Sequence, residues 1–93
     1  MKQYDLTWTA KGWEDYISWQ QAKTGDKKKL EKVNALIKDI LRTPFDGIGQ
    51  PEQLTGDLSD CWSRHIDSKN RIVYRVQEDR VVITNCRTHY GDK

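Results

Sequence analysis

Two spacings of hydrophobic residues divide the chain at a segment that contains both of its prolines, residues 44–51. Before this segment, apolar residues recur every three or four positions, the spacing of a helix that buries one face. After it, apolar and polar residues alternate, which is typical of strands with one buried face. Helices followed by strands predict an α+β fold in which two helices pack over one face of an antiparallel sheet. The other face of that sheet is then available for function.

The first part of the chain predicts a short strand followed by a helix. Leu6 and Trp8 alternate with polar neighbours, as in a short strand. Thr9 is a favourable N-cap, because its hydroxyl group can accept a hydrogen bond from a backbone N–H group of the first turn. Gly25 and Asp26 interrupt the helix. Its buried stripe is expected to consist of the apolar residues Trp13, Tyr16 and Ile17, with Gln20 continuing the same spacing.

The second helix has the clearest helical period in the sequence. One stripe of its surface is apolar and is expected to face the core, with Leu30, Val33, Ile37, Ile40 and Leu41. The helix is predicted to end near Thr43, because Pro44 disfavours a helical conformation for the residue before it. Lysines surround its start, at Lys23, Lys27, Lys28, Lys29 and Lys32. Such a run either forms the solvated side of a helix or contacts a polyanion.

Three strands are predicted after Pro51, over residues 62–66, 71–76 and 80–87. The alternation places Arg64 on the apolar face of the first of them. It places polar side chains on the opposite, open face, at His65, Arg71 and Arg75.

Imidazole and guanidinium groups on the open face suit the binding of a phosphate. His89 lies just past the last strand and shares the parity of Ile83, Asn85 and Arg87. A solvated sheet surface shows the same alternation and is the alternative interpretation. Glu52 follows Pro51 directly, where a carboxylate can be held over the sheet as a general base. A solvated charge in a loop is the alternative for this residue.

The composition indicates one polar domain over residues 1–93. Apolar residues make up 35% of the chain, and the mean hydropathy is −0.91. No apolar run approaches the ~18 residues of a membrane span, and no signal-like stretch opens the chain, so a cytoplasmic location without membrane association is expected. Four Trp and four Tyr residues argue against disorder. The net charge of +2 is low for a protein that binds free nucleic acid, so such binding would require a partner.

Neither a metal nor another cofactor is expected. Cys61 and Cys86 lie far apart and lack the clustered spacing of a zinc site, for which His65 and His89 are the other good donors. The cysteines are expected to be small buried thiols in a reducing compartment.

Several short motifs occur in an order that a known family shares. The most distinctive is Arg-Thr-Pro-Phe-Asp-Gly-Ile-Gly-Gln-Pro-Glu at residues 42–52. The others are Trp-Glu-Asp-Tyr at 13–16, the helical segment at 33–40, Trp-Ser-Arg at 62–64, Asn-Arg-Ile-Val-Tyr at 70–74 and Cys-Arg-Thr-His-Tyr at 86–90. In this order, which covers almost the whole chain, they resemble the RelE/YoeB superfamily of bacterial toxin–antitoxin ribonucleases, specifically its Txe/YoeB branch.

The resemblance implies a type II toxin that inhibits translation as a ribosome-dependent, metal-independent mRNA endonuclease. The family's general base is a glutamate after a Gly-x-Gly-x-Pro segment, which corresponds to Glu52. An arginine that opens the Arg-Ile-Val-Tyr strand steadies the phosphate and corresponds to Arg71. The terminal general acid and stacking aromatic correspond to His89 and Tyr90. Substrate contacts are expected from His65, Arg64 and Arg87, and ribosome contacts from Lys27, Lys28, Lys29 and Lys32.

The resemblance also implies the partners. They are mRNA in the A site of the 70S ribosome, a cognate antitoxin, and operator DNA reached only through the toxin–antitoxin complex. A toxin homodimer stays open. A non-catalytic module of the same fold, docking to antitoxin, ribosome or DNA, is the alternative function. Two departures from the family keep it open, because His65 stands where close relatives have an arginine and Gln50 where a lysine is often found.

Overall fold

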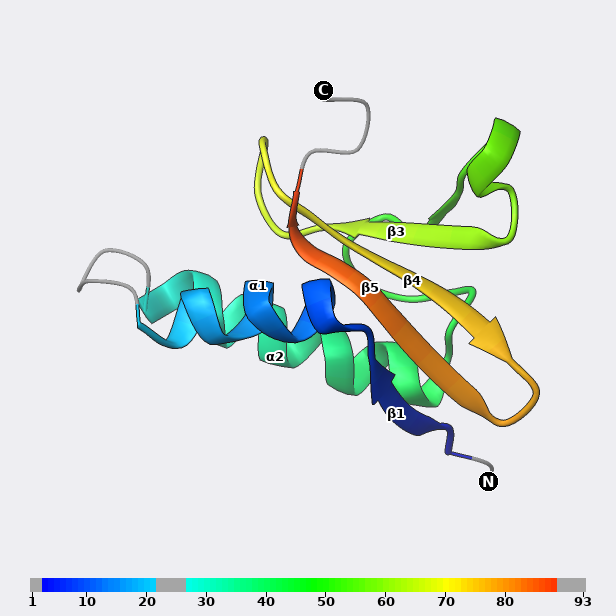
Figure 1. The fold of residues 1–93 in the computed structure, drawn as a ribbon, viewed down its shortest axis with the longest axis horizontal. Helices are drawn as coiled ribbons and strands as arrows, with labels where there is room; N and C mark the ends of the chain where they lie inside the picture. The colour runs from blue at the N-terminus through cyan, green and yellow to red at the C-terminus, as the bar shows by residue number, and fades with distance from the viewer. Residues whose placement is uncertain (1–2, 22–26, 89–93) are drawn as a thin grey trace.

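The structure, a computed structural model, describes residues 3–21 and 27–88 and contains in them two α-helices and a five-stranded sheet (Figure 1). The helices are α1 (Ala10–Gln20) and α2 (Lys27–Arg42). The strands are β1 (Asp5–Trp8), β2 (Glu52–Gln53), β3 (Cys61–His65), β4 (Arg71–Gln77) and β5 (Arg80–Thr88). A short 3-10 helix, η2 (Gly56–Leu58), lies between β2 and β3. The three predicted C-terminal strands are confirmed, with ends that differ from the prediction by at most one residue.

The sheet is mixed rather than wholly antiparallel, with the strand order β1-β5-β4-β3-β2. β1 lies at one edge and pairs with β5 in parallel, with Leu6 opposite Val81. The other neighbouring strands of this sheet are antiparallel. Alternation of Leu6 and Trp8 correctly predicts a strand, but it carries no information on direction. That direction follows from α1, which continues from β1 and packs along β5.

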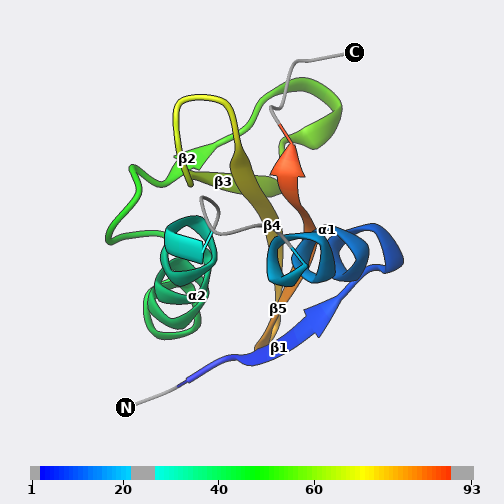
Figure 2. The same cartoon turned by 90° about the vertical axis from the view of Figure 1, so that its left-hand side faces the viewer.

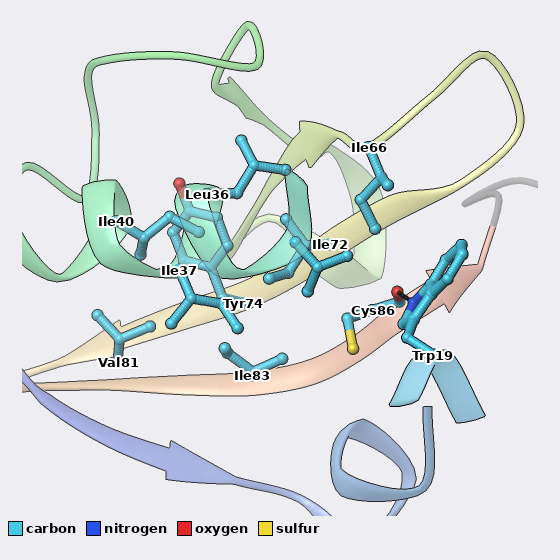
Figure 3. Close-up of a cluster of buried hydrophobic side chains, with 11 residues drawn as sticks. Trp19, Leu36, Ile37, Ile40, Ile66, Ile72, Tyr74, Val81, Ile83 and Cys86 are labelled. Carbon is cyan, nitrogen blue, oxygen red and sulfur yellow. Dashed lines mark hydrogen bonds between the residues drawn. The ribbon is translucent and has the colours of Figure 1, made fainter. Parts of the chain in front are cut away.

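Both helices cover one face of the sheet (Figure 2). The core lies between the helices and the sheet and is a single cluster of buried side chains, most of which are labelled in Figure 3. Its members are Trp19, Val33, Leu36, Ile37, Ile40, Ile66, Ile72, Tyr74, Val81, Ile83 and Cys86. The predicted apolar stripe of α2 is confirmed, and Leu30 and Leu41 pack at its edges. Within the described residues, no helix combines the length and apolar character that a membrane span needs.

The buried face of α1 differs from the predicted one and consists of Gly12, Asp15 and Trp19. Thr9 caps the helix as predicted, accepting a hydrogen bond from Gly12 N–H at 3.0 Å. Trp13 is 48% exposed and packs beside Trp8 instead of entering the core. The face of α1 that contains Gly12 is buried because α1 approaches β5 closely there. A Cβ atom at Gly12 would lie only 2.3 Å from a backbone oxygen of β5.

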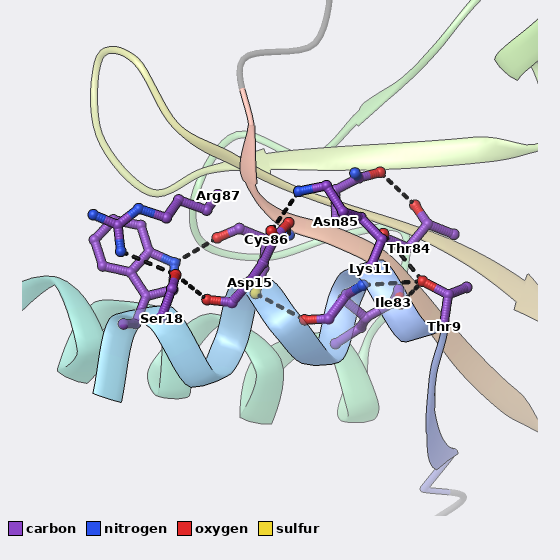
Figure 4. Close-up of polar contacts among 11 residues, drawn as sticks. Thr9, Lys11, Asp15, Ser18, Ile83, Thr84, Asn85, Cys86 and Arg87 are labelled. Carbon is purple, nitrogen blue, oxygen red and sulfur yellow. Dashed lines mark hydrogen bonds and ion pairs between the residues drawn. The ribbon is translucent and has the colours of Figure 1, made fainter. Parts of the chain in front are cut away.

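Polar contacts hold α1 against an irregular part of β5 (Figure 4). The Asp15 carboxylate accepts a hydrogen bond from Cys86 N–H at 3.0 Å, and the Trp19 indole donates to Cys86 C=O at 2.6 Å. Two register shifts between β4 and β5 lie in this region. They turn both Ile83 and Cys86 toward the helices, whereas Asn85 lies opposite Val73. The shared parity predicted for Ile83 and Asn85 is therefore wrong.

Candidate active site

Three strands place predicted site residues on the face of the sheet that the helices leave uncovered. Glu52 on β2 lies opposite Ser63 on β3, and His65 on β3 lies opposite Arg71 on β4. Because opposed residues of neighbouring strands share a face, Glu52, His65 and Arg71 lie on the same side. The Oε1 atom of Glu52 is 3.6 Å from the Nη1 atom of Arg71. This ion pair joins β2 to β4 across the strand between them.

The exposure of this ion pair suits contact with a substrate. The Glu52 side chain is 55% exposed and the Arg71 side chain 18%. A separation of 3.6 Å exceeds the usual length of an N–H···O hydrogen bond, so the two charges form a loose pair. A phosphate can therefore replace the carboxylate beside the guanidinium, for which the flat guanidinium group is well shaped.

A buried arginine holds the segment that leads to Glu52, residues 43–51, here called the strap. Arg64 is 0% exposed, and its five N–H groups match five hydrogen bonds. The acceptors are Thr43 O (2.6 Å), Asp46 O (3.0 Å), Ile48 O (3.1 Å), the Asp39 carboxylate (2.6 Å) and the Tyr74 hydroxyl (3.1 Å). Because Arg64 is fully buried, its side chain is not accessible to a substrate, contrary to the predicted contact. Arg64 fixes the backbone of the strap instead.

Asp39 and Tyr74 complete this hydrogen-bond network around Arg64. The sequence pattern predicts this role for neither residue. Burial of Asp39 opposes its ionisation, but hydrogen bonds from Arg64 and from Ile48 N–H outweigh burial and hold the pKa of the Asp39 carboxyl below its usual value. The Tyr74 hydroxyl donates to Pro44 O at 2.6 Å. Burial raises the pKa of Tyr74, so the hydroxyl keeps the proton that it donates.

The end of the strap requires unusual backbone conformations. Gly49 has a φ of 80° and Gln50 a φ of 56°, both in the left-handed region. A Cβ atom at Gly49 would lie 2.6 Å from the Leu36 side chain. The Gly49 carbonyl accepts a hydrogen bond from His65 N–H at 2.8 Å, which attaches the strap to β3. Glu52 follows two residues after Gln50, so the strap sets where its carboxylate can reach.

Arg87 lies against α1 rather than beside Glu52. Its Cζ atom is 4.1 Å from the centre of the Trp19 ring, and its Nη1 group donates to the Ser18 hydroxyl at 3.1 Å (Figure 4). The register shifts in β5 turn this side chain to the helix side, and its role in substrate binding stays a prediction.

Two of the predicted catalytic residues, His89 and Tyr90, lie outside the described residues. The description ends at Thr88, which pairs with Arg71. Of the predicted ribosome-binding lysines, Lys27, Lys28 and Lys32 are exposed on α2.

Lys29 instead forms an ion pair with Asp67, with 2.7 Å between its Nζ atom and the carboxylate. Burial of Asp67 raises its pKa, but this hydrogen bond and those from the following turn reverse the effect and lower it.

Both cysteines are buried thiols. Cys61 lies in a second small cluster with Leu54 and Val73, and Cys86 lies in the main core. Burial raises the pKa of Cys86 to about 12 and also raises that of Cys61, so neither thiol is a reactive nucleophile. In residues 3–21 and 27–88, no group of three or more His, Cys, Asp or Glu side chains is placed to hold a metal ion.

Comparison with known proteins gives the family. Residues 8–90 match the YoeB-like toxins of bacterial type II toxin–antitoxin systems. The toxin YoeB of Streptomyces coelicolor is 48% identical over 85 residues, which are 91% of this chain and 98% of that protein.

Solved structures agree with this match over nearly the whole fold. The YoeB/ParE toxin from Agrobacterium tumefaciens has a TM-score of 0.86 at 44% identity, covering 92% of this chain and 99% of that chain. The match to a YoeB–YefM complex from Staphylococcus aureus has a TM-score of 0.81 at 36% identity, covering 95% of this chain and 99% of that chain. The chain thus belongs to the YoeB-like toxins of bacterial type II toxin–antitoxin systems.

Proposed function

We propose that this toxin is a metal-independent endoribonuclease that cleaves mRNA in the ribosomal A site. The observation that carries the proposal is the Glu52–Arg71 pair, in which a carboxylate and a guanidinium lie 3.6 Å apart on the open face of the sheet. The Glu52 carboxylate can take a proton, and the Arg71 guanidinium can hold the phosphate beside that carboxylate.

The proposed reaction uses the ribose 2′-hydroxyl of the RNA as nucleophile. Glu52 takes its proton, and the 2′-oxygen forms a bond to the adjacent phosphorus. The bond from phosphorus to the 5′-oxygen of the next nucleotide breaks, and His89 protonates that oxygen. The products are a 2′,3′-cyclic phosphate and a 5′-hydroxyl. Arg71 stabilises the extra negative charge on the phosphate in the transition state.

The proposed roles of His89 and Tyr90 are a general acid and a stacking aromatic. Their support is the family resemblance and the sequence, in which His89 directly follows Thr88, the residue that pairs with Arg71 of β4. His65 is proposed as a further substrate contact, since it lies opposite Arg71 on the neighbouring strand.

The toxin alone is expected to orient the RNA poorly for the reaction. With a net charge of +2, the protein is expected to bind free RNA weakly and in a salt-sensitive manner. A ribosome that holds the mRNA in a reactive geometry would supply this orientation. The exposed lysines at the start of α2 are proposed to contact ribosomal RNA.

Substitution of Lys27, Lys28 and Lys29 together by glutamate is expected to weaken ribosome association, because attraction to RNA phosphates becomes repulsion. Co-sedimentation with ribosomes at physiological salt measures the effect. The triple variant also breaks the Lys29–Asp67 ion pair, and the matched control Asp67→Asn breaks that pair while keeping all three lysines. Unchanged co-sedimentation of the triple variant would contradict a ribosome-contacting role.

A cognate antitoxin is proposed as the protein partner, as in the YoeB–YefM complex from Staphylococcus aureus. A segment with acidic side chains would complement the arginine and histidine on the open face. Contacts with operator DNA are proposed to be made by the antitoxin in the complex.

Expression of the toxin without an antitoxin tests whether it acts as an enzyme. Growth arrest is expected for the wild type, and its loss is expected for both Glu52→Ala and His89→Ala, because each removes a proton-transfer group. Immunoblotting must show that each variant accumulates as wild type does. Growth arrest that survives both substitutions would contradict catalysis by these residues and would favour a non-catalytic binding module.

A further inference from the structure

The hydroxyl group of Ser63 is unusual because it is buried without a hydrogen bond. Ser63 is 1% exposed. In the part of the chain that the structure describes, its Oγ atom is the one buried side-chain nitrogen or oxygen that has no hydrogen-bond partner. Removing a hydroxyl from water without giving it a partner is unfavourable. Alanine would avoid this penalty at the same position, so folding alone does not account for a serine there.

The position of Ser63 connects this hydroxyl with the candidate active site. Ser63 lies directly opposite Glu52 of β2 and opposite Val73 of β4. Directly opposed residues in antiparallel strands have Cβ atoms about 4.5–5.5 Å apart. Arg71 lies opposite His65, two residues along β3. The Glu52–Arg71 ion pair therefore passes over β3 between Ser63 and His65, and the Ser63 side chain is on that same face.

We propose that Ser63 is a positioning residue for Glu52, an inference that rests on the proposed function. In the free toxin, the Glu52 carboxylate is paired with Arg71. When the phosphate of the RNA binds Arg71, the carboxylate loses this partner. The Ser63 hydroxyl then donates a hydrogen bond to the carboxylate and holds it toward the ribose 2′-hydroxyl. Ser63 keeps its own proton, and no bond to substrate is formed.

This role predicts effects on catalysis and on stability that differ in direction. Ser63→Ala removes a hydrogen bond that forms only with substrate, so kcat should fall about 10- to 100-fold while KM changes little. The same substitution removes a buried hydroxyl without a partner, so the melting temperature should equal or exceed that of the wild type. A residue with a purely structural role would instead lower the melting temperature.

The pH profile of the rate provides a second readout. A hydrogen bond donated to a carboxylate favours its ionised form, which is the form that acts as a base. Without the Ser63 donor, the acidic limb of the profile should move to higher pH. Among the charged and titratable groups on this face, Arg71 of β4 pairs with Glu52 and His65 of β3 lies opposite Arg71, and both are the same in the two proteins. A shift between wild type and Ser63→Ala is therefore assigned to the hydroxyl.

The experiment measures ribosome-bound cleavage of a defined mRNA, from pH 5 to 9, for the full-length wild type, Ser63→Ala, Ser63→Thr and Glu52→Ala. Ser68→Ala, in the exposed turn after β3, is the control for loss of a remote hydroxyl. The expected result is reduced kcat and a shifted acidic limb for Ser63→Ala at undiminished melting temperature, with most of kcat retained by Ser63→Thr.

Three other results would overturn the inference. If Glu52→Ala is inactive while Ser63→Ala has the wild-type kcat and profile, Ser63 does not position the base, although the proposed function stands. If Ser63→Ala melts at a lower temperature and loses activity with an unshifted acidic limb, its hydroxyl serves the fold. If Glu52→Ala cleaves as fast as wild type, the proposed function fails, and the role of Ser63 fails with it.

Discussion

Glu52→Gln is expected to reduce the rate of ribosome-bound mRNA cleavage by about 10²- to 10⁴-fold, the usual contribution of a positioned general base. Glutamine has nearly the same size but cannot take the proton of the ribose 2′-hydroxyl. A single-turnover cleavage assay with excess toxin measures this effect on the chemical step.

The same substitution is expected to leave the fold intact. Glu52 is more than half exposed, and an exposed ion pair contributes at most about 1 kcal/mol to stability. The free energy of unfolding should therefore change by less than about 1 kcal/mol. Glu14→Gln, at an exposed position on α1, is the matched control and should change neither quantity. Cleavage by Glu52→Gln within threefold of wild type would contradict the assignment of Glu52 as base.

Arg64→Met is expected to lower the free energy of unfolding by about 3–5 kcal/mol, the usual effect of removing one partner of a buried ion pair. The substitution removes all five hydrogen bonds of the guanidinium and leaves the Asp39 carboxylate without its cationic partner. Activity should fall as well, because the strap no longer holds Glu52 in place. Chemical denaturation followed by tryptophan fluorescence measures the loss of stability.

A matched control and the pH dependence distinguish this network from a general effect of losing an arginine. Arg80→Met removes an exposed arginine and should change stability by less than about 1 kcal/mol.

The pKa of Asp39 is lowered in the folded protein. The stabilising contribution of the Asp39 carboxylate is therefore complete above the pKa of about 3.9 that it has in the unfolded chain, and it is lost as the pH falls through its pKa in the folded protein. The stability difference between wild type and Arg64→Met should therefore shrink below about pH 4. A variant as stable as wild type at pH 7 would refute the structural role of Arg64.

The sequence was sufficient to predict those elements whose pattern comes from burial of one face. The stripe of α2 includes Val33, Ile37 and Ile40, all of which are buried, and Pro44 limits how far that helix can extend. Alternation in β3 and β4 correctly placed Ile72 and Tyr74 toward the helices and Arg71 away from them. Strict periods of 3.6 and 2 make such predictions reliable, because each residue's face follows from its neighbour's.

Errors arose where tertiary contacts override the local pattern. α1 buries Gly12 and Asp15 because it packs closely on β5 and because a carboxylate satisfies the Cys86 N–H. An apolar periodicity has no means of indicating a buried glycine or aspartate. Register shifts in β5 broke the parity on which the placement of Arg87 depended. A bulge changes the face of every later residue in a strand, and no residue type marked these two.

The candidate site divides in the same way. Proximity of Glu52 and Arg71 agrees with the expectation from the family resemblance, which placed both residues around one phosphate. Alternation with Trp62 and Ile66 places Arg64 on the apolar face of β3 and so indicates its burial. It does not indicate the five hydrogen-bond acceptors of Arg64, which come from α2, the strap and β4. Contacts between such distant segments depend on the complete fold. The unpaired hydroxyl of Ser63 likewise becomes visible only when neighbouring strands are assembled.

Primer extension on a defined mRNA, incubated with purified toxin in the presence and absence of ribosomes, shows whether the toxin cleaves ribosome-bound mRNA with Glu52 as base. New 5′ ends are expected within the coding sequence when ribosomes and wild-type toxin are both present, and none with Glu52→Gln or with RNA alone. Equal cleavage of RNA without ribosomes, or an unchanged pattern with Glu52→Gln, would contradict the proposed function.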